Sequence, residues 1–187
     1  EKPLLALHEH NESERVARIL AQLQAGKCLA LVSDAGTPLI SDPGYRLVRE
    51  LRAAGIVISP IPGPCAAIAA LSVAGIASDR FSFEGFLPHK ASARRERLQG
   101  LAGEVRTLVF YESSHRIEEC LADMRAAFGD GREAVLAREI TKLFEEVRRS
   151  SLHDLAAHYA AAGPPKGEIV LVIGPPAATP AIAADVI

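Results

Sequence analysis

Two short segments of the chain carry side chains that can take or share a proton. Residues 110–116 read FYESSHR and residues 137–142 read AREITK, and each segment begins inside or directly after an apolar run typical of a buried strand. Their acid–base side chains are Glu112, His115, Glu139 and Lys142. Such groups at strand ends suit general acid–base catalysis, although each equally fits a helix cap or an internal structural bond, so the assignment of a base stays open.

Two loops rich in glycine and proline form a second group of candidates. Residues 33–44 (SDAGTPLISDPG) follow the apolar run 28–32, and residues 60–66 (PIPGPCA) overlap the end of the run 56–61. In open α/β sheets, ligands bind beyond the carboxyl ends of the strands, and loops with small side chains let a ligand lie against the backbone. One such loop fits an ordinary connection between a strand and a helix. Two in succession favour a binding site.

Basic side chains gather at one place in the second half of the chain. Within eight positions the sequence places Lys90, Arg94, Arg95 and Arg97. This cluster fits either a solvated helix face or contacts to a nucleic-acid backbone. Arg116 and Arg138, together with Lys142, are further candidates for holding phosphate or positioning a substrate.

Composition excludes several other classes of protein. The 187-residue chain has a net charge of only −2 and no apolar run as long as a membrane span. Its three widely spaced cysteines predict buried thiols in a reducing cytoplasm and neither disulfides nor zinc. His8 and His10 have no matching ligand pair, so we expect polar loop histidines and no metal site.

The first part of the chain alternates helical and strand patterns. Helices are predicted over 11–26, 45–54 and 65–74, and strands over 28–32 and 56–61, an order typical of a mainly parallel sheet. Asn11 with Glu14 three residues later resembles a capping box.

A linker near residues 76–80 separates this part from a second α/β domain. The predicted strands are 81–84, 107–111, 134–138 and 167–173, and the predicted helices are 91–101, 114–128 and 151–162, the last capped by Ser151. We therefore expect an N-terminal domain over 1–78, a C-terminal domain over 79–174 and a loosely held tail over 175–187.

Six motifs in a fixed order identify a family resemblance. They are SDAGTPLISDPGY (33–45), PGPCAA (62–67), EGFLP (84–88), FYESSHR (110–116), AREITK (137–142) and KGEIVLV (166–172). From about Leu7 to Ile173 the chain closely resembles the tetrapyrrole methylase family, the class III S-adenosylmethionine (SAM) methyltransferases. FYESSHR and AREITK favour the branch that methylates small-subunit ribosomal RNA over the precorrin methylases.

The resemblance implies a fold and an activity. Members have two α/β domains with SAM in the cleft between them and are usually homodimers. This branch methylates a ribose 2′-hydroxyl of a cytidine in the decoding region of 16S rRNA, so the expected partner is 16S rRNA or the small ribosomal subunit. The opening strand of the family and its Pro-Ile-Gly-Asn-Leu-Gly-Asp-type loop are not found in this sequence. The N-terminal domain is therefore expected to lack its first strand, and whether the chain is active without it stays open.

The resemblance also assigns residues to the cofactor. Gly36, Thr37 and Pro38 match the family's Gly-Asp-Pro turn, and the remaining expected contacts are Leu39, Ile40, Cys65, Ala66, Ala137, Gly167 and Ile169. Part of each motif equally serves only to shape a turn. Two other functions remain open: a SAM-dependent methylase of a corrin-type small molecule, and a non-catalytic RNA-binding fragment.

Overall fold

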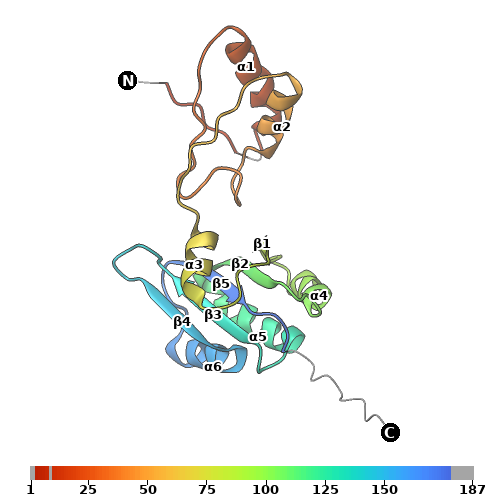
Figure 1. Ribbon diagram of the computed structural model, residues 1–187, viewed down its shortest axis with the longest axis vertical. Helices are drawn as coiled ribbons and strands as arrows, with labels where there is room; N and C mark the ends of the chain where they lie inside the picture. Colours follow the sequence, from red (N-terminus) through yellow and green to blue (C-terminus); the bar gives the residue numbers. More distant parts are fainter. Residues whose placement is uncertain (1–2, 9, 178–187) are drawn as a thin grey trace. The chain divides into compact units, whose positions relative to one another are not determined.

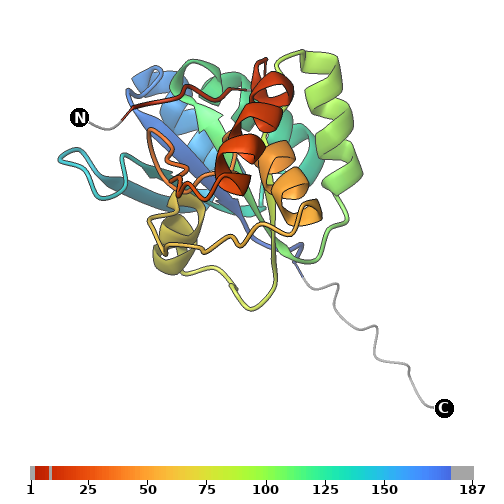
Figure 2. The same cartoon turned by 90° about the horizontal axis from the view of Figure 1, so that it is seen from above.

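Two helices, α1 (Glu12–Gln24) and α2 (Tyr45–Ala53), form the folded centre of the first part of the chain. The computed structural model describes residues 3–8 and 10–177 and divides the chain into two units, Glu1–Cys65 and Ala66–Ile187. Helices α1 and α2 lie side by side (Figures 1 and 2). Their buried contacts are Val16 and Ile19 on α1 and Leu47 and Leu51 on α2. Both helices confirm the apolar periodicity of the sequence.

The start of α1 differs from the prediction. The Asn11 side chain caps no helical N–H and instead accepts a hydrogen bond from the His8 backbone at 2.9 Å, so the predicted capping box does not form. The first carboxylate of the helix, Glu12, is buried and accepts a hydrogen bond from the Leu47 N–H of α2 at 3.0 Å. Glu12 thereby caps α2 from outside, because Gly44, the residue before the first turn of α2, has no side chain to do so.

The two strands predicted in this unit are wrong. Residues 28–32 and 56–61 pair with no other segment among the described residues of the unit, so they form no ladder. Several of their apolar side chains are exposed, Val32 at 79% and Val57 at 88% among them. Apolar content alone does not make a strand, because the backbone groups also require a hydrogen-bonding neighbour. The predicted parallel sheet is therefore absent from the described part of Glu1–Cys65.

The second unit contains a five-stranded mixed sheet. Its strands are β1 (Phe81–Phe86), β2 (Thr107–Ser113), β3 (Glu133–Arg138), β4 (Glu146–Ser151) and β5 (Glu168–Ile173), in the order β1-β2-β5-β3-β4. β1 pairs with β2 in parallel, and the other neighbours are antiparallel. Four of the strands confirm the prediction. β4 was not predicted because it lies at the edge and carries exposed polar side chains with no buried face.

Helices cover both faces of this sheet. On one face, α4 (Ala91–Leu101), α5 (Ile117–Phe128) and α6 (Leu152–Ala162) bury a core with Phe110, Leu136 and Leu171. A short 3₁₀ turn, η1 (Ser114–Arg116), connects β2 to α5. Ser151 accepts a hydrogen bond from the Asp154 N–H at 3.1 Å, which confirms the predicted cap of α6.

The small helix α3 (Ala66–Ala74) packs on the opposite face against β2, β3, β4 and β5 (Figure 1). Its buried positions, Ala67, Ala70, Leu71 and Ala74, repeat at helical spacing, and the small side chains permit a close approach to the strands. α3 therefore belongs to the second unit, and the division at Cys65 precedes the linker predicted near 76–80. Most of the predicted tail, 178–187, lies outside the described residues.

Among the described residues, no helix combines the length and the apolar character needed to cross a membrane.

Candidate functional site

The two glycine- and proline-rich loops of the first unit are joined directly. The Thr37 hydroxyl donates a hydrogen bond to the Pro64 carbonyl at 2.8 Å, across 27 positions of sequence. In the first loop, the Ser33 hydroxyl donates to the Gly36 carbonyl at 3.1 Å. A Cβ at Gly36 would lie 3.8 Å from the same Pro64 oxygen. Both loops are expected in one site from their sequence, and the hydrogen bond between Thr37 and Pro64 brings them together.

The backbone of the first loop adopts an uncommon conformation. Leu39 and Ser41 have φ angles of 72° and 60°, in the left-handed region that side chains with a Cβ disfavour. Gly44 follows at φ 131°, and a Cβ there would lie 3.0 Å from the Leu39 side chain. Such strain persists where the surroundings fix the conformation, and it concentrates at ligand sites. Loop 36–44 is thus a preformed structure.

Three of the six sequence motifs meet at one end of the inner strands, where β2 and β3 end and β5 begins. Glu112 at the end of β2 pairs with Ile169 of β5, and Ile169 in turn pairs with Arg138 of β3. Paired residues on antiparallel strands share a face, so FYESSHR, KGEIV and AREITK place side chains in one row. One position further out, Ser113 pairs with Glu168, and Glu168 accepts a hydrogen bond from the Glu139 N–H at 3.0 Å.

Glu112 and Arg116 form an internal structural pair. One Glu112 oxygen accepts from the Ser113 N–H at 2.7 Å, and the other accepts from Arg116 at 3.2 Å. Arg116 also donates to the Leu87 and Pro88 carbonyls at 3.0 and 3.1 Å, which ties the end of β2 to the loop after β1. Both members of the pair are thus engaged inside the protein. His115, between them in sequence, is exposed, and its ring makes no hydrogen bond to a described residue.

Glu139 and Lys142 form a second linked group with Glu168. Lys142 Nζ lies 2.8 Å from Glu139 Oε1 and 3.0 Å from Glu168 Oε2. The hydrogen bond from Lys142 and the backbone N–H of Glu168 hold the pKa of Glu139 below its ordinary value, and the two carboxylates raise the pKa of Lys142. The charged forms are favoured, so these groups are better suited to positioning than to moving a proton at neutral pH.

The other residues expected at this end of the strands are Ala137, Arg138, Gly167 and Ile169, of which Ala137 and Ile169 are buried. These two present almost no surface to a ligand among the described residues. Arg138 donates to Glu146 at 3.2 Å and to the Lys166 carbonyl at 2.9 Å, and so links β3 to β4 and to the start of β5. Gly167, at φ 105°, leaves room for the Glu139 side chain, which a Cβ would overlap.

The basic cluster of α4 is largely neutralised. Arg94 is buried and forms an ion pair with Asp123 at 2.7 Å and another with Glu119 at 3.2 Å. Its guanidinium is therefore withdrawn from the surface on which the sequence analysis placed it. Arg95 pairs with the same Asp123 at 2.8 Å, and Arg97 pairs with Glu84. Within the described residues, Lys90 forms no ion pair.

No group of three His, Cys, Asp or Glu side chains in residues 3–8 and 10–177 is arranged to hold a metal ion.

A family model decides where the chain belongs. The family described as Tetrapyrrole (Corrin/Porphyrin) Methylases matches residues 2–156. The chain belongs to this family. Tetrapyrrole methylases are SAM-dependent methyltransferases, and the match spans both units and five of the six motifs in full.

Several curated relatives of this tetrapyrrole methylase share more than half of the aligned residues with it. The "Ribosomal RNA small subunit methyltransferase I" of Xylella fastidiosa (strain Temecula1) is 59% identical over 174 residues, which is 92% of this chain and 64% of that protein. The protein of the same name from Pseudomonas aeruginosa is 56% identical over 92% of this chain and 62% of its own length. The chain thus spans less than two thirds of these relatives.

Solved structures of other methylases share the fold. The methyltransferase CobJ matches with a TM-score of 0.65 at 23% identity, covering 88% of this chain and 71% of that one. Diphthine synthase matches with a TM-score of 0.69 at 15% identity, covering 92% and 70%. A uroporphyrin-III C-methyltransferase from Thermus thermophilus, complexed with S-adenosyl homocysteine, matches at 0.58 and 18%, covering 88% and 73%.

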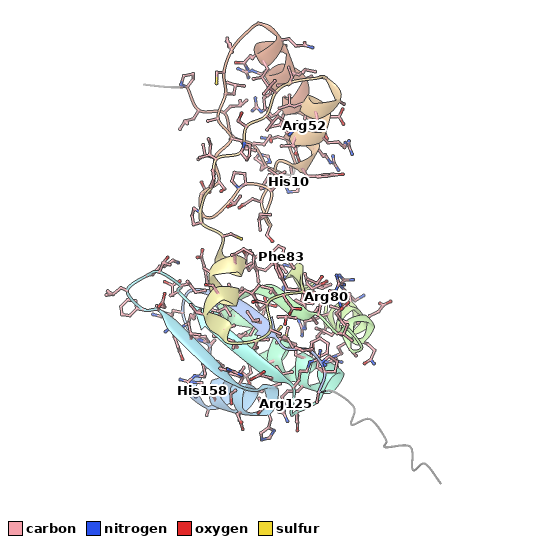
Figure 3. The ribbon with its side chains drawn as sticks, in the orientation of Figure 1. His10, Arg52, Arg80, Phe83, Arg125 and His158 are labelled. Atoms are coloured by element: carbon pink, nitrogen blue, oxygen red, sulfur yellow. The ribbon has the colours of Figure 1, made fainter. Side chains whose placement is uncertain are left out.

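Tyr111, the residue before Glu112, makes structural contacts that sequence reasoning did not single out. Its hydroxyl accepts a hydrogen bond from the Ala67 N–H at 3.1 Å and so fixes the start of α3, directly after the second loop. Its ring packs edge-on against Phe83 at 4.9 Å and Phe86 at 5.6 Å (Figure 3 labels Phe83). The signal was present, because Tyr111 lies within FYESSHR on the strand face opposite Glu112.

Proposed function

We propose that the chain is part of a SAM-dependent methyltransferase that modifies small-subunit ribosomal RNA at the 2′-hydroxyl of a cytidine ribose in the decoding region of 16S rRNA. The observation that carries this proposal is the 59% identity to a ribosomal RNA small subunit methyltransferase I across 92% of the chain. The family description alone would also fit a corrin-type substrate. The corrin and porphyrin methylases among the structural neighbours, however, are only 18–24% identical.

The linked loops of the first unit are the proposed SAM-binding elements. Gly36 precedes a turn from Thr37 to Ile40, which the Ile40 N–H closes by donating to the Thr37 carbonyl at 3.2 Å. The Thr37–Pro64 hydrogen bond fastens this turn to the second loop. A preformed loop pays little ordering entropy when a ligand binds, and backbone groups can hold the polar ends of SAM. Cys65 ends the second loop, and Ala66 is the first residue of α3. We expect Ala137, Gly167 and Ile169 to contribute through backbone and shape.

His115 is the proposed proton acceptor. Methyl transfer is an in-line displacement in which the ribose oxygen bonds to the methyl carbon, the carbon–sulfur bond breaks and the hydroxyl proton leaves. Glu112 already accepts two hydrogen bonds, and Glu139 is held in its charged form by Lys142 and the Glu168 N–H. The His115 side chain is exposed, and histidine is the side chain that most often serves as a general base. We therefore assign Glu112, Glu139 and Lys142 to positioning.

We further propose that the protein works in the cytoplasm as a homodimer on 16S rRNA or the assembled small subunit. A protein that modifies ribosomal RNA has to meet it where ribosomes assemble. The basic residues on and next to α4 that are left to contact the RNA backbone are Lys90, Arg95 and Arg97. Arg94 is buried, and Arg116 and Arg138 donate hydrogen bonds to carbonyls of the protein.

Two measurements test the proposal together. Isothermal titration with SAM measures donor binding, and transfer of a radiolabelled methyl group onto small subunits that lack this modification measures the reaction. Label mapped to a cytidine ribose supports the proposal. SAM binding with label only on a corrin acceptor supports the small-molecule alternative. Absence of SAM binding supports the non-catalytic RNA-binding alternative.

The base assignment has its own test. His115→Ala should lower the methylation rate at least tenfold and leave the affinity for SAM unchanged, and His115→Gln should not restore the rate. Glu112→Gln should instead lower the thermal stability, because it weakens the bond to Arg116. A His115→Ala variant with unchanged rate and pH profile would move the role to another group.

A further inference from the structure

The structure reverses the expected location of uncompensated positive charge. All three arginines of α4 pair with carboxylates from β1 or α5, namely Glu84, Glu119 and Asp123. A phosphate that approached them would compete with a carboxylate already in place. The α4 cluster is therefore a weaker anion site than its sequence indicates.

Helix α2 presents a different arrangement. Its arginines, Arg46, Arg49 and Arg52, follow at intervals of three residues and are all exposed. Arg46 donates to the neutral Ser13 hydroxyl at 2.8 Å, and Arg52 pairs with no carboxylate within the described residues (Figure 3 labels Arg52 on α2). Arg49 pairs only with its exposed neighbour Glu50 at 2.7 Å, an interaction that contributes little in water.

An exposed aromatic ring completes this face. Tyr45, the first residue of α2, is 66% exposed, and the Arg49 guanidinium lies over its ring at 5.8 Å from the centroid. Helices α1 and α2 also border an open groove of about 720 Å³. Its lining combines apolar side chains with charged ones, among them Val16, Ala17, Leu20, Ala53, Arg46, Arg49 and Glu50. One exposed ring next to guanidinium groups that have no buried carboxylate partner suits a nucleotide, whose base stacks while its phosphate is held.

We propose that the α2 face, defined as Tyr45, Arg46, Arg49 and Arg52, is an RNA-backbone contact surface of the first unit. This inference rests on the proposed function and adds to it a contact surface for the RNA substrate. Arg46, Arg49 and Arg52 bind successive phosphates, and Tyr45 stacks on an unpaired base. The Arg49–Glu50 pair opens when a phosphate replaces the carboxylate.

Charge and shape favour RNA over an acidic polypeptide as the occupant. The groove is lined by Ser13, five apolar residues, Arg46, Arg49 and Glu50, so an acidic helix would have to seat its apolar side chains beside the Glu50 carboxylate. A flexible phosphodiester chain needs only spaced cations and a ring to stack on. If an acidic polypeptide is the occupant, polyglutamate should compete fully with RNA for this surface.

The test compares two double variants of the 187-residue chain that each remove two positive charges. Arg49→Ala/Arg52→Ala alters the proposed surface, and Arg18→Ala/Lys27→Ala removes exposed charges of α1 and its following loop as the matched control. Arg46 is kept because its bond to Ser13 joins the helices. Fluorescence anisotropy with a labelled 16S decoding-region RNA, measured from 50 to 300 mM salt, gives the affinity and its salt dependence.

We expect the α2 variant to bind at least tenfold more weakly at low salt and to lose about 1.5 from the slope of log affinity against log salt, while the control loses less than half of that. Arg49→Lys/Arg52→Lys should keep the slope and so excludes misfolding as the cause. Tyr45→Ala should weaken binding about tenfold without changing the slope, and Tyr45→Phe should bind as wild type.

Equal affinities for the two double variants would overturn the inference and leave the proposed function intact. Complete competition by polyglutamate at matched charge concentration would also overturn it, in favour of an acidic polypeptide. Absence of RNA binding by the unaltered chain at every salt concentration would instead contradict the proposed function.

Discussion

Glu12 of α1 accepts a hydrogen bond from the backbone N–H of Leu47, in the first turn of α2, at 3.0 Å. The carboxylate is buried, and Gly44 at the start of α2 provides no side chain for this purpose. A negative group also interacts favourably with the positive end of a helix. One side chain therefore both joins α1 to α2 and caps α2.

Removing this carboxylate should destabilise the first unit. We expect Glu12→Ala to lower the free energy of unfolding by about 1–2 kcal/mol, in the range of a lost helix cap. Urea denaturation followed by circular dichroism measures the change. Glu14 lies in the same first turn of α1 but is exposed, so Glu14→Ala is the control and should have little effect. Equal stabilities of the two variants would show that the bond to Leu47 contributes nothing.

Arg94 and Arg95, adjacent in sequence and bound to the same carboxylate, should differ sharply. Arg94→Ala leaves the buried Asp123 with one exposed partner, and we expect a loss of about 3 kcal/mol. Arg95 is 68% exposed, so Arg95→Ala should cost less than about 1 kcal/mol. Thermal unfolding of both variants checks the difference. A larger loss for Arg95→Ala would contradict the structural role assigned to Arg94.

Asp123 should make stability depend on pH in the acid range. Burial would raise the pKa of this carboxyl, but hydrogen bonds from Arg95 and Arg94 outweigh it and hold the pKa below its ordinary value. A group whose pKa is lower in the folded state stabilises the protein above its unfolded pKa of about 3.9, and this contribution is lost as pH falls through the folded value. The stability difference between the wild type and Asp123→Asn should therefore shrink below about pH 4.

Other carboxyls with a lowered pKa, among them Asp130, Glu139 and Glu146, are present in both proteins and cancel in that comparison, and Glu104 is removed in addition. Hydrogen bonds from the Arg106 side chain and backbone lower the pKa of Glu104 to about 2, so it titrates in the same range. Both proteins are therefore compared in a Glu104→Gln background by denaturant titration between pH 2.5 and 7. A stability difference that stays constant over this range would rule out the Asp123 assignment.

Two glycines of the second unit should respond in opposite directions to alanine. Gly167 has a φ of 105°, and a Cβ there would overlap the Glu139 side chain, so Gly167→Ala should destabilise by about 2 kcal/mol and disturb the Glu139–Lys142–Glu168 group. Gly100 lies within α4 with open space around it, so Gly100→Ala should stabilise by about 0.5 kcal/mol. Differential scanning calorimetry measures both, and a neutral Gly167→Ala would show that Glu139 moves aside freely.

The helices and inner strands could be predicted because their apolar periodicity reflects burial on one face. α4 was predicted with its correct bounds, and α6 was predicted with its Ser151 cap. The strands expected at 28–32 and 56–61 show the limit of this reasoning, because pairing depends on a neighbouring segment that local sequence does not specify. β4 shows the converse, since a strand at the edge needs no apolar alternation.

Side-chain partners set a similar limit at the candidate site. The sequence placed Glu112, Glu139 and Arg138 near strand ends, and the sheet register brings their motifs to one edge. It could not show that Arg94 is buried, because its partner Asp123 lies 29 positions away on another helix. Residue type suggested an RNA contact for Arg94, whereas the tertiary neighbour determines whether its charge is available.

The three cysteines should report on both units through their reaction with a thiol reagent. Cys28 is exposed, so the predicted buried thiol is wrong at this position, and it should react within seconds to minutes. Cys120 is fully buried as predicted, and its pKa is raised by burial and by the neighbouring Glu112. The thiolate is the reactive form, so Cys120 should react only after unfolding. Titration with a chromogenic disulfide, with and without denaturant, measures the two phases. Cys28→Ser should remove the fast phase, and rapid labelling of Cys120 in the native protein would show that the α5 core opens readily.

Cys65, of intermediate exposure, ends the second loop, so saturating S-adenosyl homocysteine should slow its labelling and leave that of Cys28 unchanged if the linked loops bind the methyl donor.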